Sequence, residues 1–457
     1  MRFKRIKNLH FIGIGGTGMC GIAEVLLNTG YKISGSDLKK TETTEYLESL
    51  GIDIKYGHDG ANVQGSDVVV ISSAVSDENP EVVAAKTQKI PVIRRAEMLS
   101  ELMRMKFSIA VAGTHGKTTT TSLIGQILRY GGLDPTVIVG GRVLGVGSNA
   151  YLGKGDYLVA EADEFDRSIT RFFPTVAVIT NIEAEHMECY RDLDDLHDCF
   201  VEFANRVPFF GTIIVCSDDP GIQSIGGKFA RPVITYGLTE GADFSAQDVR
   251  FEEPDLSFTL VHKGVELARV RSPLLGFHNV RNILAGIAAS HDLEIPLGMA
   301  LDAIKSFTGV GRRLELAGEI KGIRFYDDYG HHPTEIKTTL EGVRAVFKGR
   351  MVAVFQPHLY SRTQRLHEEF GGAFFDADEL IVLDVFPSRE KALDGVSGKL
   401  VVDSAIRQGH KSVSYVEDKN RLSDFMRDRL RQGDRVILFG AGDINKLTQR
   451  IMERLRE

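Results

Sequence analysis

The chain has 457 residues, of which 43% are hydrophobic and 26% are charged, and its formal net charge is −7. This length predicts about three domains of roughly 100 to 200 residues each. The acidic balance argues against a general nucleic-acid binder, so we expect no nucleic-acid partner and expect anionic substrates to meet local positive groups.

Membrane association is not expected from the sequence. No apolar run reaches the roughly 18 residues of a membrane-spanning helix, and the basic N-terminal segment leads into a glycine turn, which predicts a surface strand instead of a signal peptide. The 4 cysteines lack C-x-x-C spacing, which is typical of reduced thiols. Together these features predict a cytoplasmic protein and leave a monomer and a homodimer both open.

A glycine-rich turn follows the first predicted strand. Gly13, Gly15 and Gly18 have G-x-G-x-x-G spacing ahead of a helix predicted at about 19–28, and the next strand ends on Asp37. This arrangement is typical of dinucleotide sites, where glycines admit a diphosphate to the helix end and the carboxylate binds a ribose hydroxyl. The additional glycine in GIGGTGM also suits a nucleotide-sugar diphosphate.

Further strands in this first region are predicted at 54–56, 68–72 and 92–93. Ser72 and Ser73 lie at the carboxyl end of the second of these, where open α/β sheets bind ligands. Ligand binding and capping of a turn or helix are both open for these two serines.

The segment GTHGKTTT follows an apolar strand at 109–112 and starts a helix. Its glycines, Gly113 and Gly116, let backbone N–H groups converge on an anion, and Lys117 adds a positive charge at the helix N-terminus. Thr118 stands where a P-loop places the hydroxyl that binds Mg²⁺. The leading glycine is closer to the lysine than in the general P-loop pattern. The alternative is a turn that only starts a helix, but a strand before and a helix after favour a phosphate site.

Two later strands of the same region end in groups that suit a divalent cation. One ends in the acidic run EADEFD, which starts at Glu161, and hard cations prefer such oxygen ligands. The other, at 175–181, ends on Asn181 and leads to Glu183, Glu185 and His186. A single histidine after a strand is more often structural than functional. Because Glu161 and His186 each follow a strand of the P-loop region, their combination favours a metal site.

The rest of the central region predicts more strands and an alanine-rich helix. Asn279 and Asn282 share one face of that helix, and capping hardly explains both. The alternating segments predict an antiparallel sheet appended to the parallel one, at 233–236, 244–251, 256–261 and 265–270.

The last region begins after a glycine-bearing hinge at 307–314. A strand then ends in DDYGHHPTE, and the proline starts the next helix. Further strands beginning near 351, 379 and 435 alternate with helices, which predicts another nucleotide-binding-like α/β domain.

Nine motifs together resemble one family: GIGGTGM, GTHGKTTT, EADEFD, TNIEAEH, HNVRN, GVGRR, DDYGHHPTE, QPHLYSRT and FGAGDI. In this order they are similar to the Mur ligases, the ATP-dependent amide-forming enzymes of peptidoglycan precursor synthesis, and in particular to the member that acts on UDP-N-acetylmuramate and L-alanine. The resemblance implies an α/β fold of three domains. These are a Rossmann-like UDP-sugar-binding domain at 1–107, a central P-loop ATP-binding domain with a mostly parallel sheet and added antiparallel strands at 108–310, and a Rossmann-like domain at 311–457 that closes on ATP and the amino acid.

The resemblance also implies roles for individual residues. Lys117, Glu161, His186 and His331 would be catalytic, and Thr118, Glu161 and His186 would bind Mg²⁺. Residues implied to contact ATP are Gly113, Thr114, His115, Gly116, Lys117, Thr118, Thr119, Asn279, Asn282, Arg312 and Asp328. Residues implied to contact the nucleotide sugar or alanine are Gly15, Gly16, Thr17, Gly18, Met19, Asp37, Ser72, Ser73, Tyr329, His358 and Arg362, with His331 beside the last three.

The chain departs from the family pattern at two places. Leu359 stands where many relatives carry arginine, so carboxylate recognition would depend on Arg362. Several sister ligases use a carbamylated lysine near a second Mg²⁺, and no lysine occurs between Glu188 and Asn205. A second metal site would have to be built differently.

The implied reaction activates the lactyl carboxylate of UDP-N-acetylmuramate as an acyl phosphate, which the amine of L-alanine then attacks. The alternatives of the same architecture are a later Mur ligase, the murein-peptide recycling ligase and a folylpolyglutamate synthase-like ligase. An NAD-dependent oxidoreductase could use the turn between Gly13 and Asp37, but the P-loop would then have no role. A non-catalytic nucleotide-sugar-binding protein is the remaining alternative.

Overall fold

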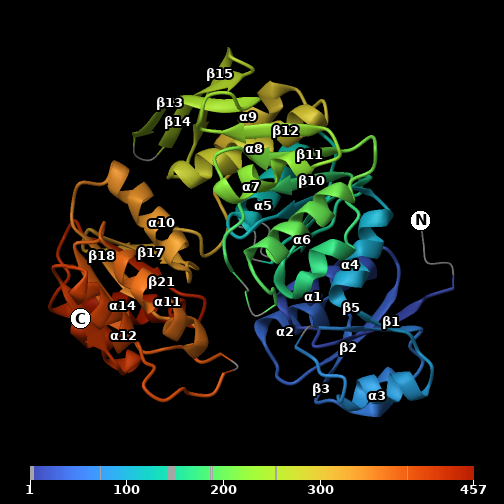
Figure 1. Cartoon of the computed structure of the whole chain (residues 1–457). Coiled ribbons are helices and arrows are strands. Elements are labelled where there is room, and N and C mark those ends of the chain that lie inside the picture. Colours follow the sequence, from blue (N-terminus) through green and yellow to red (C-terminus); the bar gives the residue numbers. More distant parts are fainter. Residues whose placement is uncertain are drawn as a thin grey trace. The chain divides into compact units, whose positions relative to one another are not determined.

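The computed structural model describes residues 5–72, 74–140, 150–185, 187, 189–252, 255–388 and 390–456. Within these residues the strands form three sheets, which confirms the predicted α/β class (Figure 1). The chain divides into two compact units. One comprises Met1–Val249, Ser257–Pro273 and Val280–Thr308, and the other comprises Arg250–Leu256, Leu274–Asn279 and Gly309–Glu457.

The N-terminal sheet is parallel and has the strand order β3-β2-β1-β4-β5. The order reverses beside β1, so the loops after β1 and β4 lie together at a topological switch point. The strands are β1 (Asn8–Ile12), β2 (Lys32–Asp37), β3 (Asp53–Tyr56), β4 (Val68–Ile71) and β5 (Val92–Arg94). The helices are α1 (Thr17–Asn28), α2 (Glu42–Ser49), η1 (Gly60–Val63), α3 (Pro80–Thr87) and α4 (Arg95–Arg104).

Local sequence signals explain where these helices begin. Thr41 caps α2 in a capping box with Thr44, and Asn79 accepts a hydrogen bond at the start of α3, where proline is the first helical residue. Helix α1 begins at Thr17, two residues before the expected start, and has no side-chain cap. Its N-cap residue is Gly16, so the helix starts directly from the glycine turn.

A buried polar network connects the N-terminal sheet to helix α3. The Glu81 carboxylate is fully buried and accepts hydrogen bonds from Ser36 Oγ at 2.8 Å and Asn62 Nδ2 at 2.8 Å. It also contacts His10 Nε2 at 3.0 Å and His58 Nδ1 at 3.2 Å. Burial alone would raise the pKa of Glu81, but the hydrogen bonds from His10, Asn62 and Ser36 outweigh it and lower the pKa to about 2.

The central sheet has the order β15-β14-β13-β12-β11-β10-β6-β9-β7-β8. Its middle strands are buried apolar runs, as a parallel sheet covered on both faces requires. The strands are β6 (Phe107–Ala112), β7 (Thr136–Ile138), β8 (Ala150–Tyr151), β9 (Tyr157–Glu161), β10 (Val176–Ile179), β11 (Thr212–Cys216), β12 (Val233–Gly237), β13 (Phe244–Glu252), β14 (Asp255–His262) and β15 (Val265–Ser272). The helical segments are α5 (Lys117–Tyr130), η2 (Phe165–Arg171), α6 (Leu193–Asn205), α7 (Pro220–Ile225), η3 (Gly226–Lys228), α8 (Phe277–Asp292) and α9 (Leu297–Ser306).

The parallel part of this sheet extends farther than the sequence indicated. Strand β12 pairs in parallel with both β11 and β13. The strand predicted at 233–236 therefore continues the parallel sheet instead of starting an antiparallel one. Periodicity shows that a segment is a strand, but its direction depends on the course of the connecting chain.

The C-terminal sheet has the order β16-β17-β21-β18-β19-β20, in which only the described pair β16–β17 is antiparallel. Two buried apolar clusters cover its faces. The strands are β16 (Glu315–Ile320), β17 (Ile323–Asp328), β18 (Met351–Phe355), β19 (Glu379–Leu383), β20 (Val413–Val416) and β21 (Arg435–Phe439). The helical segments are α10 (Pro333–Val346), α11 (Tyr360–Gly372), α12 (Lys399–Arg407), η4 (Lys419–Arg421), α13 (Leu422–Arg427) and α14 (Asn445–Arg456).

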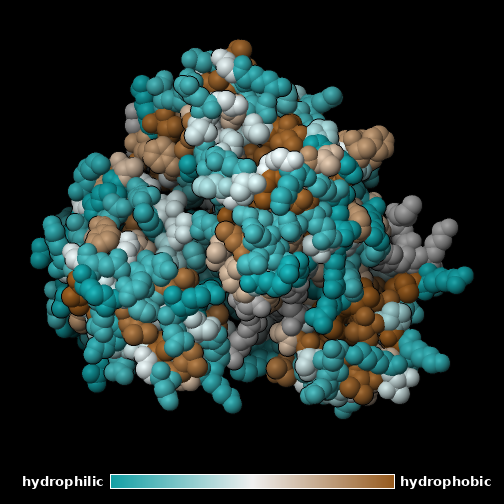
Figure 2. Space-filling model, viewed as in Figure 1, coloured by the Kyte–Doolittle hydropathy of each residue, from teal (hydrophilic) through white to brown (hydrophobic). Residues whose placement is uncertain are grey.

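The face of the molecule in Figure 2 is mainly hydrophilic, with hydrophobic residues in scattered groups. In the part of the chain that the structure describes, every helix is too short or too polar to span a membrane.

Candidate functional site

The loop between β6 and α5 has a backbone that only glycine accommodates at its two ends. Gly113 has φ +130° and Gly116 has φ +82°. A Cβ atom on Gly113 would lie 2.1 Å from Thr180 Oγ1, and one on Gly116 would lie 2.8 Å from Asn282 Oδ1. The predicted P-loop therefore combines backbone angles that other residues rarely adopt with close packing.

Residues after β10 hold the middle of this loop. The main-chain N–H of His115 donates to Asn181 Oδ1 at 2.8 Å, and Asn181 Nδ2 donates back to the His115 carbonyl at 3.0 Å. The Thr180 hydroxyl donates to the same carbonyl at 2.6 Å. Asn181 belongs to the loop that the sequence analysis singled out, but its support of the P-loop, and that of Thr180, was not predicted because both lie far from it along the chain.

The start of α5 is suited to an anion. The helix begins at Lys117, and the structure shows no side-chain cap for it. The first N–H groups of a helix have no intrahelical acceptors, and the helix dipole favours negative charge at this end. Thr118 and Thr119 follow in the first turn. This geometry fits the predicted binding of phosphate groups.

Lys117 lies in a nearly closed polar environment. Its Nζ donates to the carbonyls of Gly113 at 2.6 Å and Thr114 at 3.2 Å, and it contacts both carboxylate oxygens of Glu164 at 2.9 and 3.2 Å. Burial alone would lower the pKa of Lys117, but Glu164 and nearby Asp163 raise it, so the ammonium is charged. Glu164 was not among the predicted site residues, although it belongs to the acidic run EADEFD.

Glu161 ends β9 beside the first turn of α5. Burial raises the pKa of its carboxyl, while hydrogen bonds from the Thr118 side chain and the Gly140 backbone act in the opposite direction. Its Oε1 is buried, and no hydrogen-bond donor among the described residues reaches it. A buried carboxylate oxygen without a donor, next to a threonine hydroxyl, fits a hard cation. The third predicted metal ligand, His186, lies outside the described residues.

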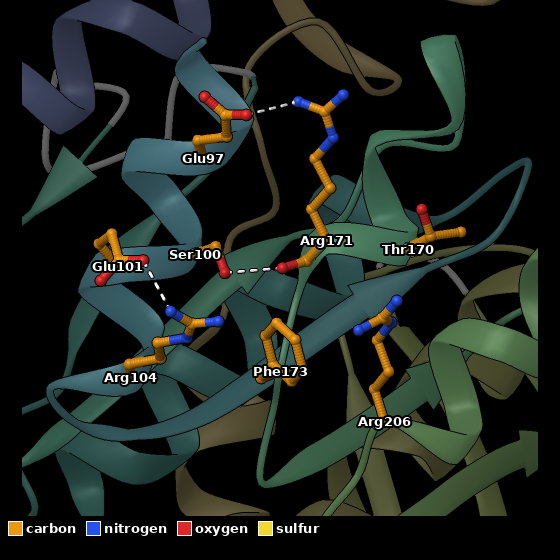
Figure 3. A pocket seen from close by; sticks show the side chains of 8 residues that line it. All are labelled: Glu97, Ser100, Glu101, Arg104, Thr170, Arg171, Phe173 and Arg206. Atoms are coloured by element: carbon orange, nitrogen blue, oxygen red, sulfur yellow. Dashed lines mark hydrogen bonds and ion pairs between the residues drawn. The ribbon is translucent and has the colours of Figure 1, made fainter. Parts of the chain in front are cut away.

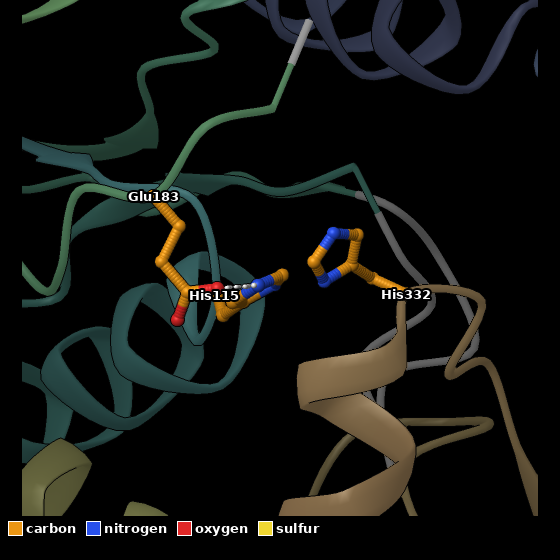
Figure 4. A group of neighbouring side chains, drawn as sticks. All are labelled: His115, Glu183 and His332. Atoms are coloured by element: carbon orange, nitrogen blue, oxygen red, sulfur yellow. Dashed lines mark ion pairs between the residues drawn. The ribbon is translucent and has the colours of Figure 1, made fainter. Parts of the chain in front are cut away.

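Another acidic residue lies at the P-loop. Glu183 Oε2 is 3.5 Å from His115 Nε2, and Figure 4 shows the two side chains next to each other. The main-chain N–H of Glu183 donates to Thr114 Oγ1 at 2.9 Å. The loop after β10 thus contributes charge to the P-loop as well as support.

The two asparagines of α8 lie in different surroundings. Asn282 is buried, and its Oδ1 accepts from Thr120 Oγ1 at 3.1 Å behind the P-loop. Asn279 Nδ2 donates to the Leu275 carbonyl at 2.7 Å.

The glycine turn of the N-terminal sheet is fixed by Asp37. Its Oδ2 accepts from the Gly15 N–H at 2.9 Å, and its Oδ1 accepts from the Leu38 N–H at 2.8 Å. A Cβ on Gly18 would lie 2.7 Å from Arg95 Nη1. Arg95, which the sequence analysis missed, therefore places a cation at the start of α1, beside the predicted Gly18.

Ser72 closes the other side of this turn. A Cβ on Gly13 would lie 3.2 Å from Ser72 Cβ, so the end of β4 brings this serine against the glycine loop. Ser73 and the side chain of Thr17 lie outside what the structure describes.

In the C-terminal unit, buried acids organise the loops around Tyr329. Asp328 accepts from the Leu314 N–H at 2.8 Å and the Gly330 N–H at 2.7 Å, and burial raises its pKa to about 6. Arg312 donates to Asp327 at 3.0 Å and to the Gly440 carbonyl at 2.6 Å. Its guanidinium also lies 5.1 Å from the ring centroid of Tyr329.

Two predicted histidines come together at the same edge of the sheet. The ring centroids of His331 and His358 are 6.2 Å apart, and Tyr329 is 5.2 Å from His331. Glu335 Oε2 accepts from the main-chain N–H of His331 at 3.0 Å. Arg362 is half-buried in the first turn of α11, which begins just after Leu359.

A surface pocket lies between α4, η2 and the end of α6 (Figure 3). Arg104 and Arg206 lie over the Phe173 ring, 4.6 and 4.8 Å from its centroid. Each arginine of the pocket faces a carboxylate, in the pairs Arg104–Glu101, Arg171–Glu97 and Arg206–Glu202. The positive charge of this pocket is therefore already balanced by carboxylates.

Comparisons with known proteins agree with this geometry. Family models match at residues 8–107 (Mur ligase family, catalytic domain), 111–290 (Mur ligase middle domain) and 312–442 (Mur ligase, glutamate ligase domain). The UDP-N-acetylmuramate–L-alanine ligase of Geotalea daltonii is 49% identical over 455 residues, covering 100% of this chain and 99% of the relative. That of Geobacter sulfurreducens is 46% identical over 457 residues, covering 100% of this chain and 99% of the relative.

Solved structures give the same result. The UDP-N-acetylmuramate–alanine ligase MurC of Thermotoga maritima has a TM-score of 0.83 and 29% identity, with 99% of each chain covered. A murein peptide ligase of Psychrobacter arcticus, with a TM-score of 0.71, 24% identity and 98% of each chain covered, shares the fold. The resemblance seen in the motifs is thus confirmed over the full length, and the chain belongs to the Mur ligase family.

Proposed function

We propose that this protein is an ATP-dependent ligase that joins L-alanine to the carboxylate of UDP-N-acetylmuramate in peptidoglycan precursor synthesis. The observation that carries the proposal is the P-loop geometry from Gly113 to Lys117, in a chain similar along its whole length to UDP-N-acetylmuramate–L-alanine ligases. An oxidoreductase would leave this P-loop without a role.

The chemistry follows from the poor reactivity of a carboxylate. One oxygen of the lactyl carboxylate attacks the γ-phosphorus of ATP, the bond to the bridging oxygen breaks, and ADP leaves. The neutral amine of L-alanine then attacks the acyl phosphate carbonyl. Inorganic phosphate leaves with the proton that the amine loses, and an amide bond remains. Phosphoryl transfer of this kind depends mainly on positioning and charge neutralisation.

We assign the phosphate-binding role to Gly113, Thr114, His115, Gly116, Lys117, Thr118 and Thr119. Lys117 is charged and lies at the start of α5, where it can neutralise the transferred group. Thr118 and Glu161 would hold Mg²⁺, with His186 as a further ligand. A bound Mg²⁺ would polarise the phosphate oxygens and neutralise their charge.

The other predicted residues complete the proposal. The UDP moiety would bind at the first glycine turn and at the ends of the two neighbouring strands. The residues proposed to contact it are Gly15, Gly16, Thr17, Gly18, Met19, Asp37, Ser72 and Ser73. The muramate carboxylate and alanine would be oriented by Tyr329, His331, His358 and Arg362. The nucleotide would be contacted by Asn279, Asn282, Arg312 and Asp328. We propose that the region from 311 onward closes on ATP, because an acyl phosphate hydrolyses when water reaches it.

The first test is a phosphate-release assay with UDP-N-acetylmuramate, ATP and single amino acids. We expect release with L-alanine that requires all three substrates, and mass spectrometry should show UDP-N-acetylmuramoyl-L-alanine. Release that instead requires a tripeptide would indicate a murein-peptide ligase. Absence of ATP hydrolysis together with nicotinamide binding would contradict the proposal.

Replacing Asp37 should weaken use of the nucleotide sugar. In Asp37→Ala the Gly15 N–H loses its charged acceptor, which costs about 1.5 to 3 kcal/mol, so KM for UDP-N-acetylmuramate should rise roughly 10- to 100-fold. KM for ATP should stay near the wild-type value. Steady-state kinetics with each substrate varied would measure both. Asp53→Ala, which removes an exposed carboxylate from β3, is the control, and an equal change there would contradict a specific role for Asp37.

A further inference from the structure

The contact between Lys117 and Glu164 bears on how nucleotide binds. The two side chains are only 16% and 2% exposed, so water screens their charges weakly. Both carboxylate oxygens of Glu164 lie within hydrogen-bond distance of Nζ. An ammonium has three N–H donors, and here it faces four oxygens, including the carbonyls of Gly113 and Thr114. A phosphate oxygen that accepts from Nζ must therefore replace one of these contacts.

Hydrogen bonds to the main chain of Glu164 fix the turn from which its carboxylate reaches Lys117. The Tyr190 hydroxyl donates to the Glu164 carbonyl at 2.5 Å, and the Arg167 N–H donates to it at 3.0 Å. Arg167 has φ +61°, which is unusual for a residue other than glycine, and its guanidinium is paired with Asp195 at 2.6 Å. A strained residue held by an ion pair indicates that the turn after Glu164 is well determined.

We infer that Glu164 competes with the nucleotide phosphates for Lys117 and thereby makes nucleotide binding depend on a divalent cation. This inference rests on the proposed function, in which phosphates bind at the P-loop. A nucleotide without a cation brings several negative charges close to Glu164, and the two repel each other. A divalent cation offsets that repulsion, so the carboxylate penalises free nucleotide more than metal-bound nucleotide. Glu164 is thus a positioning residue for Lys117, and it selects the metal-bound form of the substrate.

The test is calorimetric binding of ADP to the full chain with Mg²⁺ and with EDTA. We expect Glu164→Gln to bind metal-free ADP at least tenfold more tightly than the wild type, while binding with Mg²⁺ changes less. Glu164→Asp keeps the charge and should retain weak metal-free binding. In a Lys117→Met background, Glu164→Gln should give a smaller gain, because competition for the lysine is then absent and only the repulsion between carboxylate and phosphates is removed.

Glu183→Gln is the matched control. It removes a carboxylate that lies at the P-loop but contacts His115 instead of Lys117. An equal gain in Glu183→Gln would overturn the inference, since any loss of negative charge would then suffice. Unchanged metal-free affinity in a Glu164→Gln protein that still binds ADP with Mg²⁺ would also overturn it. A wild type that binds no ADP even with Mg²⁺ would instead contradict the proposed function.

Thermal unfolding gives an independent measurement. Glu164→Gln leaves the buried ammonium without its counter-ion, so the ligand-free variant should have a lower Tm than the wild type. Because ADP phosphates can take the place of that counter-ion, ADP with EDTA should raise the Tm of the variant more than that of the wild type. A smaller increase in the variant would contradict the inference.

Discussion

Replacing Glu161 with glutamine should lower kcat for ATP-dependent ligation about a thousandfold. The neutral amide cannot balance the charge of a divalent cation, and preorganised charge supplies most of the catalysis of phosphoryl transfer. The fold should tolerate the change, because burial raises the pKa of the Glu161 carboxyl and a neutral group avoids that cost. ADP formation at saturating substrates would measure the loss, and urea unfolding would measure the stability.

The control for this experiment is Glu202→Gln, which removes an exposed carboxylate from α6. It should keep wild-type kcat. A Glu161→Gln protein that retains more than a tenth of wild-type kcat would contradict the assignment of Glu161 to the metal. Loss of activity together with loss of folding would point to a structural role for the carboxylate.

Features that depend on neighbouring residues were predictable from the sequence. The P-loop at 113–117, the strand before it and the helix after it are encoded by glycine spacing and apolar runs, and the structure has them where they were expected. The glycine turn at Gly13 and Gly15 is likewise a local pattern. Such signals come from backbone angles and the accessibility of N–H groups, which a short segment determines by itself.

Features that depend on distant residues could not be predicted in the same way. The acidic run EADEFD offers several carboxylates, and the sequence favoured Glu161 for a role in the site. Which of them meets Lys117 depends on how the chain turns into η2, and that residue is Glu164. Asp37 was expected to bind a ribose hydroxyl, and the structure adds that it holds the Gly15 N–H. Supporting contacts between separate strands leave no local pattern.

Glu81→Gln should lower the free energy of unfolding by about 3 kcal/mol or more at pH 7. Glu81 accepts several buried hydrogen bonds, and each buried donor that loses its acceptor typically costs about 1 to 3 kcal/mol. The glutamine amide has one acceptor oxygen, where the carboxylate has two. Its NH₂ group would therefore face another donor, such as Asn62 Nδ2. Urea unfolding at constant ionic strength, with circular dichroism as the signal, would measure the change.

The pH dependence of this loss identifies its cause. The folded-state pKa of Glu81 is lowered from 4.5 to about 2, so its carboxylate stabilises the fold fully above pH 4.5 and loses that contribution as the pH falls toward 2. The difference between wild type and Glu81→Gln should therefore be constant near neutral pH and shrink below pH 4.5. Glu78→Gln, which changes an exposed residue just before α3, should have the same free energy of unfolding as the wild type both near neutral pH and below pH 4.5. A difference for Glu81→Gln that is independent of pH would mean that side-chain packing, and not the buried charge, stabilises this part of the N-terminal sheet.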